Sequence, residues 1–218
     1  MNVNWYTKGL YMISDIDSLI DGLRGLPETF DQLLSNTPWP SPYITATDDL
    51  SSNIVALHSF NSQLWNEEDL ARRVLVQDSV IVGHKRAIDR FNQQRNDQIE
   101  QIDEKVLNIF SAVKFNNKTC LRSSETLGSM IDRMSILSLK IYHVGLQLSR
   151  LDINDQHKLI SSDRLQVLNQ QRFDLSDSID GLINGMKSGT RYYKIYRQFK
   201  MYNDPAFNPA LVAENNAT

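Results

Sequence analysis

Residues 78–114 decide the fold class of this chain, and they read DSVIVGHKRAIDRFNQQRNDQIEQIDEKVLNIFSAVK. Positions three and four residues apart form one continuous stripe along the stretch, which is the spacing of a single face of an α-helix. Most of these positions are apolar, and Asp78 or Ser79 is a suitable N-cap. The pattern predicts one helix of about ten turns. The stripe consists of Ile81, His84, Ile88, Phe91, Arg95, Ile99, Ile102, Val106, Ile109 and Val113.

Helical periodicity continues on both sides of this stretch, in residues 48–73, 123–151 and 155–189. No proline occurs between Pro42 and Pro205, so every residue in the centre of the chain has the backbone amide that a helix needs. Short links between four consecutive helices favour antiparallel neighbours. We therefore predict an all-α fold without a sheet, in which residues 48–190 form an antiparallel four-helix bundle of up-down topology.

The two ends of the chain have a different character. Residues 1–47 are predicted to be an extension with a short helix from Ile13 to Leu26 and a stiff, proline-rich linker. Residues 191–218 begin with a segment of four basic and five aromatic side chains, a mixture that can hold single-stranded nucleic acid. The regular spacing of its apolar side chains favours instead a C-terminal helix docked on the bundle. The docking side chains would be Tyr192, Ile195, Phe199 and Tyr202.

The composition excludes several classes of protein. Among 218 residues, 41% are hydrophobic, and 23 basic against 26 acidic side chains give a net charge of −3, which argues against a protein that binds nucleic acid over its whole surface. The mean hydropathy of −0.39 and the absence of a long apolar run argue against membrane insertion. The start of the sequence lacks the pattern of a secretory signal, so the expected location is cytoplasmic.

Four polar residues interrupt the apolar stripes of the first two long helices. Asn61 and Glu68 lie on the stripe of residues 48–73, and His84 and Arg95 lie on the stripe of residues 78–114. Burial of such groups costs several kcal/mol unless each finds a partner. We therefore expect them to meet other polar side chains inside the bundle.

The rise of about 1.5 Å per helical residue indicates which polar residues lie at the same level. If the chain folds back near Val76, Glu68 lies level with His84. A second fold-back near Thr119 places Arg95 and Asn96 near His143, and Glu100 near Lys140. The expected polar layer is made of His58, Arg95, Asn96, Glu100, Lys140 and His143, with Glu68, Asp69, Arg72 and His84 nearer one end.

Two interpretations of this layer stay open. In the first, the polar residues are buried ion pairs and hydrogen bonds that fix the register of the helices. In the second, they line a pocket for an anionic or polyhydroxylated ligand, because ligand sites in bundles are built from inward side chains of facing helices. The number of ionisable groups directed at one interior favours the second interpretation slightly.

Known metal and cofactor motifs give little support for a resident metal. No glutamate has a histidine three residues later, and Cys120 is the single cysteine, so di-iron and zinc sites of the usual kind are not expected. A weak alternative is Mg²⁺, because the acidic pairs here resemble those of all-α nucleotide pyrophosphohydrolases. The residues of that alternative are Glu68, Asp69, Glu100 and Asp103.

Several long motifs resemble the hallmark runs of a bacterial family known as domain of unknown function 4254. They are residues 64–72, 84–103 and 128–143, followed by a similar tail at 200–209, and the likeness spans about Ser51 to Leu211. Members often lie near genes for surface-polysaccharide and lipopolysaccharide assembly, so the resemblance implies an accessory role in glycan synthesis. No activity is established for the family, so it implies no catalytic residue. Its hallmark polar positions are Glu68, Asp69, Arg72, His84, Asn92, Arg95, Asn96, Asp132, Arg133, Lys140 and His143.

These observations lead to one hypothesis and two alternatives. The hypothesis is a cytoplasmic helical protein whose polar interior cleft binds a phosphorylated sugar, a nucleotide sugar or a glycan-synthesis enzyme. The first alternative is Mg²⁺-dependent hydrolysis of a nucleotide pyrophosphate, and the second is a homodimer or adaptor without a small-molecule ligand. In the hypothesis, phosphate meets Arg72, Arg95, Arg133 and Lys140, hydroxyl groups meet Asn92, Asn96 and His143, and Glu68 and Asp69 orient His84 or a cation.

Overall fold

The computed structural model describes residues 13–115, 119–197, 201 and 204–216, and within them the chain is almost entirely helical. The class is all-α, as predicted. The described helices are α1 (Ile16–Arg24), α2 (Leu26–Asn36), α3 (Leu50–Leu70), α4 (Asp78–Ile109), α5 (Leu127–Leu148), α6 (Asp155–Lys187) and α7 (Pro209–Asn216), with two short strands, β1 (Leu121–Arg122) and β2 (Arg191–Tyr192). None of the described helices is long and apolar enough to cross a membrane.

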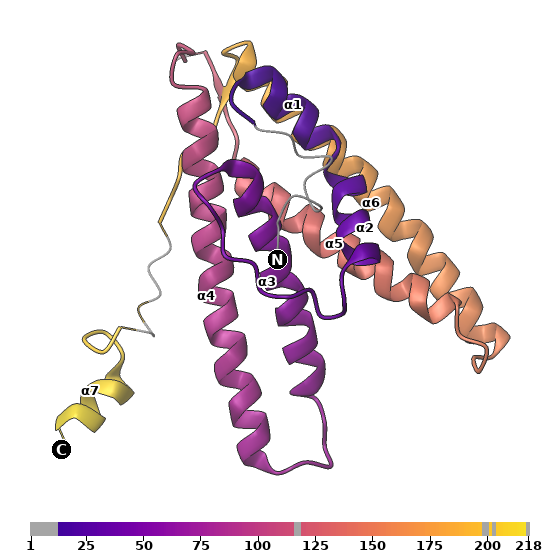
Figure 1. Ribbon diagram of the computed structural model, residues 1–218. Coiled ribbons are helices and arrows are strands. Elements are labelled where there is room, and N and C mark those ends of the chain that lie inside the picture. Colours follow the sequence, from indigo (N-terminus) through magenta and orange to yellow (C-terminus); the bar gives the residue numbers. More distant parts are fainter. Residues whose placement is uncertain (1–12, 116–118, 198–200, 202–203, 217–218) are drawn as a thin grey trace.

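The four long helices form two antiparallel hairpins, α3 with α4 and α5 with α6 (Figure 1). All four were predicted, and side-chain caps mark the starts of three of them. α4 has Gln77 as its N-cap, without a side-chain hydrogen bond, so the cap expected at Asp78 or Ser79 is wrong. Asp49 accepts the amide of Ser52 at the start of α3, at 2.8 Å, and Asn154 accepts the amide of His157 at the start of α6, at 2.8 Å. These caps satisfy backbone donors that the first helical turn leaves without partners.

The helix α3 lies at the centre of the molecule, because every residue from Leu50 to Ser62 is buried. It packs against α4 on one side and against α5 on another. A helix buried on all sides has few places for polar groups without partners. The polar residues of α3 therefore have to be matched by polar residues of the neighbouring helices, and this requirement creates the site described below.

The two hairpins diverge from the end of the molecule at which α4 ends and α5 begins (Figure 1). At that end α5 crosses closely over α4, and a Cβ atom on Gly128 would lie 2.6 Å from the carbonyl oxygen of Ile99. Beyond the crossing, α6 packs mainly on α5 and α1 in the described residues. The arrangement is thus a pair of crossed hairpins, and a regular up-down four-helix bundle is not established.

Part of the predicted N-terminal extension belongs to the core. α1 confirms the expected short helix, and α2 follows it directly because Pro27 lies in the first turn, where the missing amide is not needed. α1 packs on α6 and α2 packs on α5, and Leu19, Leu26 and Phe30 are completely buried. Residues 16–36 therefore cover the second hairpin.

The predicted C-terminal docking helix is wrong for residues 191–197. Gly189, at φ +70°, ends α6 in a conformation that favours glycine. The chain then forms β2, which pairs in parallel with β1 through Leu121 N to Thr190 O (2.9 Å) and Ser123 N to Tyr192 O (2.8 Å). In the non-helical segment that follows β2, the side chain of Tyr193 is buried and that of Ile195 is partly buried. Tyr192 lies in the strand, while Phe199 and Tyr202 lie outside the described residues.

Candidate functional site

A chain of buried polar side chains connects α3 to α5 in the middle of the molecule. The Nδ1 atom of His58 lies 2.8 Å from the hydroxyl of Ser135. The amide of Asn61 donates to the same hydroxyl, at 3.1 Å, and to Oδ1 of Asp132, at 2.9 Å. All four residues are at most 5% exposed. Hydrogen bonding is what makes the burial of these groups tolerable.

Arg95 of α4 joins this chain from the outside. Its Nε lies 3.1 Å from Oδ1 of Asp132, and 27% of its side chain stays exposed. Its Nη1 lies 3.4 Å from Oδ1 of Asn92, a long contact. Burial raises the pKa of Asp132, although the charge of Arg95 and the amide of Asn61 act in the opposite direction. The charged form of this carboxyl, which faces Arg95, is therefore less favourable than that of an exposed aspartate.

Arg95 lines a hollow of about 340 Å³ between α3, α4 and α5. We call this hollow the arginine cleft. Its size falls within the range of roughly 300–1,000 Å³ that is usual for small-molecule sites. Arg72 stands at its rim and pairs with Glu68, Nη1 to Oε2, at 2.8 Å. The cleft is lined by Asn61, Leu64, Trp65, Glu68, Asp69, Arg72, Asn92, Arg95, Ile136 and Leu139.

A second hollow of about 620 Å³ lies between the two hairpins. We call it the hairpin groove, and it shares Trp65 and Asp69 with the arginine cleft. Its lining residues are Trp65, Asp69, Lys140, His143, Val144, Gln147, Asp163, Arg164, Val167, Leu168 and Gln171.

His143 is held in the wall of the hairpin groove by aromatic rings. Its imidazole stacks on Trp65, with centroids 4.4 Å apart and planes at 3°, and the ring of Trp39 meets it edge-on at 4.5 Å. Burial lowers the pKa of His143, against the opposing charge of Asp69. Its Nε2 atom is buried without a hydrogen-bond partner among the described residues.

Most of the predicted site residues come together at these two adjoining hollows. The arginine cleft contains Glu68, Asp69, Arg72, Asn92 and Arg95, with Asp132 beneath it. Lys140 and His143 lie in the hairpin groove. The inward position expected for Arg95 is thus confirmed, whereas its role in binding stays a prediction.

Three predicted residues lie elsewhere. His84 contacts Glu67 Oε2 at 2.7 Å and Arg73 at 2.9 Å near the α3–α4 connection, so the expected pairing with Glu68 is wrong by one residue. Arg133 pairs with Glu125 at 2.7 Å and faces a third hollow, of about 540 Å³, between α5 and α6. Asn96 is half-buried and lines none of these three hollows.

The predicted register between α4 and α5 is also wrong. Arg95 meets Asp132 instead of His143, and Glu100 pairs with Arg197 of the C-terminal segment instead of Lys140. The prediction assumed a tight turn near Thr119. In the structure the connection between the two helices includes β1, and α5 begins beside Asp103, which shifts every pairing along α5 by several turns.

The acidic residues of the Mg²⁺ alternative do not converge. Glu68 pairs with Arg72, and Asp103 accepts the amide of Gly128 at 2.7 Å. Burial raises the pKa of Asp103 to about 6, despite hydrogen bonds that lower it. Within the described part of the chain, no three His, Cys, Asp or Glu residues are placed to hold a metal ion. The Mg²⁺ alternative therefore has no geometric support here.

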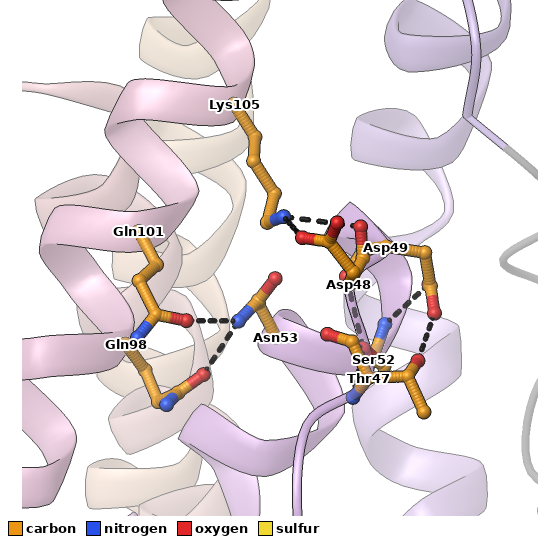
Figure 2. Close-up of polar contacts among 8 residues, drawn as sticks. All are labelled: Thr47, Asp48, Asp49, Ser52, Asn53, Gln98, Gln101 and Lys105. Atoms are coloured by element: carbon orange, nitrogen blue, oxygen red, sulfur yellow. Dashed lines mark hydrogen bonds and ion pairs between the residues drawn. The ribbon is translucent and has the colours of Figure 1, made fainter.

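A separate polar group near the start of α3 joins this helix to α4. The side-chain amide of Asn53, which is fully buried, donates to the side-chain oxygens of Gln98 and Gln101, each at 2.8 Å, and Lys105 pairs with Asp48 at 2.7 Å (Figure 2). These contacts join α3 and its N-terminal cap region to α4. None of the three hollows described above is lined by these residues, which is what the register interpretation expects at this end.

Sequence reasoning predicts only part of what shapes the site. Asn61 stands out as a polar residue on an apolar stripe, but Trp65 and Ser135 give no comparable signal. Trp65 reads as an ordinary apolar residue one turn after Asn61, and Ser135 is small enough to fit any helix face. Their roles depend on the crossing of α3 and α5, which periodicity within each helix does not specify.

No curated protein and no solved structure matches the chain. The sequence profile of one family, described as proteins of unknown function (DUF4254), matches residues 51–195. The match runs from the start of α3 to just beyond β2 and includes every residue that lines the arginine cleft and the hairpin groove. Since it covers well over half of the sequence, the chain belongs to the DUF4254 family.

Proposed function

We propose that the arginine cleft binds a phosphorylated sugar or a nucleotide sugar. The observation that carries this proposal is the position of Arg95, a partly exposed cation at the wall of a hollow, anchored from behind by the buried Asp132. Guanidinium groups form strong, directional hydrogen bonds with phosphate oxygens. Anchoring of this kind holds the guanidinium in place before a ligand arrives, which lowers the entropy cost of binding.

Electrostatics supports a negatively charged ligand. Asp132 is the acidic partner of Arg95, but burial raises the pKa of this carboxyl, and Asn61 shares the same oxygen. A phosphate in the cleft would give Arg95 a second anionic partner beside this buried carboxyl. Arg72 at the rim can contribute a second cation if it exchanges its exposed contact with Glu68 for the ligand.

The remaining lining groups suit hydroxyl groups. Asn92 offers both donor and acceptor atoms, and the carboxylates of Glu68 and Asp69 can accept hydrogen bonds from sugar hydroxyls. An anionic molecule without hydroxyls would leave these carboxylates facing its negative charge. A phosphate linked to a sugar therefore matches the cleft better than a simple polyanion.

The cellular role that we propose is an accessory one in bacterial surface-glycan or lipopolysaccharide synthesis, in the cytoplasm. Its support is the family resemblance described above, together with a cleft whose chemistry fits phosphorylated sugars. A glycan-synthesis enzyme that uses or supplies the ligand would be the natural protein partner. No reaction is assigned to the cleft.

A thermal-shift and calorimetry panel tests this proposal. Inorganic phosphate, hexose phosphates and nucleotide sugars are added to the unmodified chain, to Arg95→Gln and to Arg133→Gln. Arg133 is the matched control, because its ion pair with Glu125 lies outside the cleft. A ligand at about 100 times its Kd raises the unfolding free energy by roughly 2.7 kcal/mol, or Tm by about 5–10 °C for a chain of this size.

We expect one ligand class to stabilise the unmodified chain and Arg133→Gln but not Arg95→Gln. Because Arg95→Gln could disturb folding, Arg72→Gln at the exposed rim serves as a second variant and should weaken binding severalfold. If no compound in the panel shifts Tm, or if Arg95→Gln responds like the unmodified chain, the proposal is wrong. If no ligand binds although the protein is folded, the result favours the interpretation that the polar layer only sets helix register.

A further inference from the structure

We propose that the ligand of the arginine cleft is an amphiphile, a phosphate-bearing headgroup on a linear hydrocarbon chain that lies in the hairpin groove. This inference rests on the proposed function, because it takes the headgroup site from there. It narrows the ligand class from free sugar phosphates to sugar phosphates carried on a lipid chain.

The first argument is continuity between the two hollows. Trp65 and Asp69 belong to the wall of both, so a molecule bound beside Arg95 can extend past Trp65 into the groove without leaving the protein surface. The groove, at about 620 Å³, is larger than the cleft, at about 340 Å³. A sugar phosphate confined to the cleft would leave the larger hollow to water.

The second argument is the apolar track along the groove. Val144 of α5 and Val167 and Leu168 of α6 line it together with Trp65. Val167 is 56% exposed. The groove follows α6 from Asp163 to Gln171, a length of about 12 Å, and burial of its apolar surface by a hydrocarbon chain is favourable.

The third argument is the charge of the groove. Its charged side chains are two cations, Lys140 and Arg164, and two carboxylates, Asp69 and Asp163. This balance gives no net attraction for a second phosphate, which a nucleotide extension into the groove would bring. Lys140 and Arg164 can lay their aliphatic stems along the apolar surface and keep their charges in water. An uncharged chain fits this lining better.

A homologous series of alkyl phosphates tests the inference. Inorganic phosphate and butyl, hexyl and octyl phosphate are titrated by calorimetry, each below its critical micelle concentration. We expect affinity to rise about twofold to fourfold for each added methylene. Two variants of α6 are compared, Val167→Asp in the groove and Phe173→Asp as control, since Phe173 is 69% exposed and lines neither hollow.

Val167→Asp should abolish the dependence on chain length and leave the affinity for inorganic phosphate unchanged, while Phe173→Asp should alter neither. If phosphate binds but affinity is independent of chain length, or if Val167→Asp keeps the dependence, the inference is overturned and the proposed function survives. If neither phosphate nor any alkyl phosphate binds, both fail. If Val167→Asp lowers the sedimentation mass of the free protein, a second copy covers the groove, and the inference is again overturned.

Discussion

At the scale of single residues, the imidazole of His58 shows how the buried polar chain is maintained. Its ring stacks on Phe30 with centroids 4.7 Å apart, and its Nδ1 meets the hydroxyl of Ser135. Burial lowers the pKa of His58 to about 3, so the ring is neutral at physiological pH. A neutral ring can share a hydrogen bond with Ser135 without bringing a second positive charge near Arg95.

The lowered pKa of His58 predicts a loss of stability in acid. The unfolded chain takes up a proton below pH 6.5, whereas the folded chain resists protonation down to about pH 3. Between pH 6.5 and pH 4 this difference should remove about 3 kcal/mol of unfolding free energy. Urea denaturation at steps of about 0.5 pH unit measures how steeply the unfolding free energy depends on pH. His58→Gln should reduce that slope even if it is less stable throughout, and an unchanged slope would contradict the assignment.

Asp103 predicts the opposite dependence on pH. Its folded pKa of about 6 lies above the ordinary aspartate value of 3.8, so the folded chain favours the protonated carboxyl, and this contribution is lost as pH rises from about 4 to 6. Asp103→Asn keeps an oxygen for the amide of Gly128 and removes the charge. Relative to Asp103→Asn, the unmodified chain should lose up to about 3 kcal/mol of unfolding free energy between pH 4 and pH 7. If the unfolding free energies of the two proteins change with pH in parallel, the pKa of Asp103 is not raised in the folded chain.

At the scale of elements, the start of α5 depends on a close approach that only glycine permits. A Cβ atom on Gly128 would meet the Ile99 carbonyl at 2.6 Å and the Asp103 carboxyl at 2.9 Å. Gly128→Ala must therefore separate α5 from α4, at a cost of about 1–3 kcal/mol. Gly83 in α4 is the control, because a Cβ atom there would meet no described neighbour within 4 Å. Gly83→Ala should stabilise the chain by up to about 1 kcal/mol, and thermal melts of both variants decide whether their effects have opposite signs.

The elements themselves could be predicted because their signals are local. The stripe in residues 78–114 depends only on neighbours within one or two turns. The α4–α5 register and the strand at Arg191–Tyr192 depend on contacts with distant residues, among them Asp103 with Gly128. Periodicity therefore indicated that Arg95 faces inward but not that Asp132 is its partner.

The site was predictable to the same extent. Polar residues on apolar stripes, such as Asn61 and Arg95, are costly to bury and must find partners, and this rule led to the arginine cleft. It did not apply to Arg133, which was a candidate only through the family resemblance and which lies at the hollow between α5 and α6, paired with Glu125. The rule also says nothing of Trp65, because an aromatic ring on an apolar stripe contradicts no expectation.

At the scale of the whole molecule, the second hairpin is covered by helices that lie outside the matched family region. The family match begins at residue 51, but α1 and α2 supply seven buried apolar side chains to the core that covers α5 and α6. Ion pairs of Arg24 with Asp180 and of Arg172 with Asp31 join the same helices at the surface. The seven side chains are Leu19, Ile20, Leu23, Leu26, Phe30, Leu33 and Leu34.

This arrangement predicts that the matched region does not fold by itself. Full burial of one large apolar side chain contributes about 1.5–3 kcal/mol. Loss of seven therefore removes roughly 10–20 kcal/mol, which is comparable to or larger than the roughly 5–15 kcal/mol by which a typical domain is stable. A fragment of residues 51–195 should be unfolded or aggregated by circular dichroism and sedimentation. A fragment of residues 13–197, which lacks α7, should keep the Tm of the full chain within a few degrees, because α7 makes few contacts with the rest of the described chain. If the 51–195 fragment melts cooperatively near the Tm of the full chain, α1 and α2 are not needed for folding. Contacts with α3 and α4 would then be sufficient to stabilise α5 and α6.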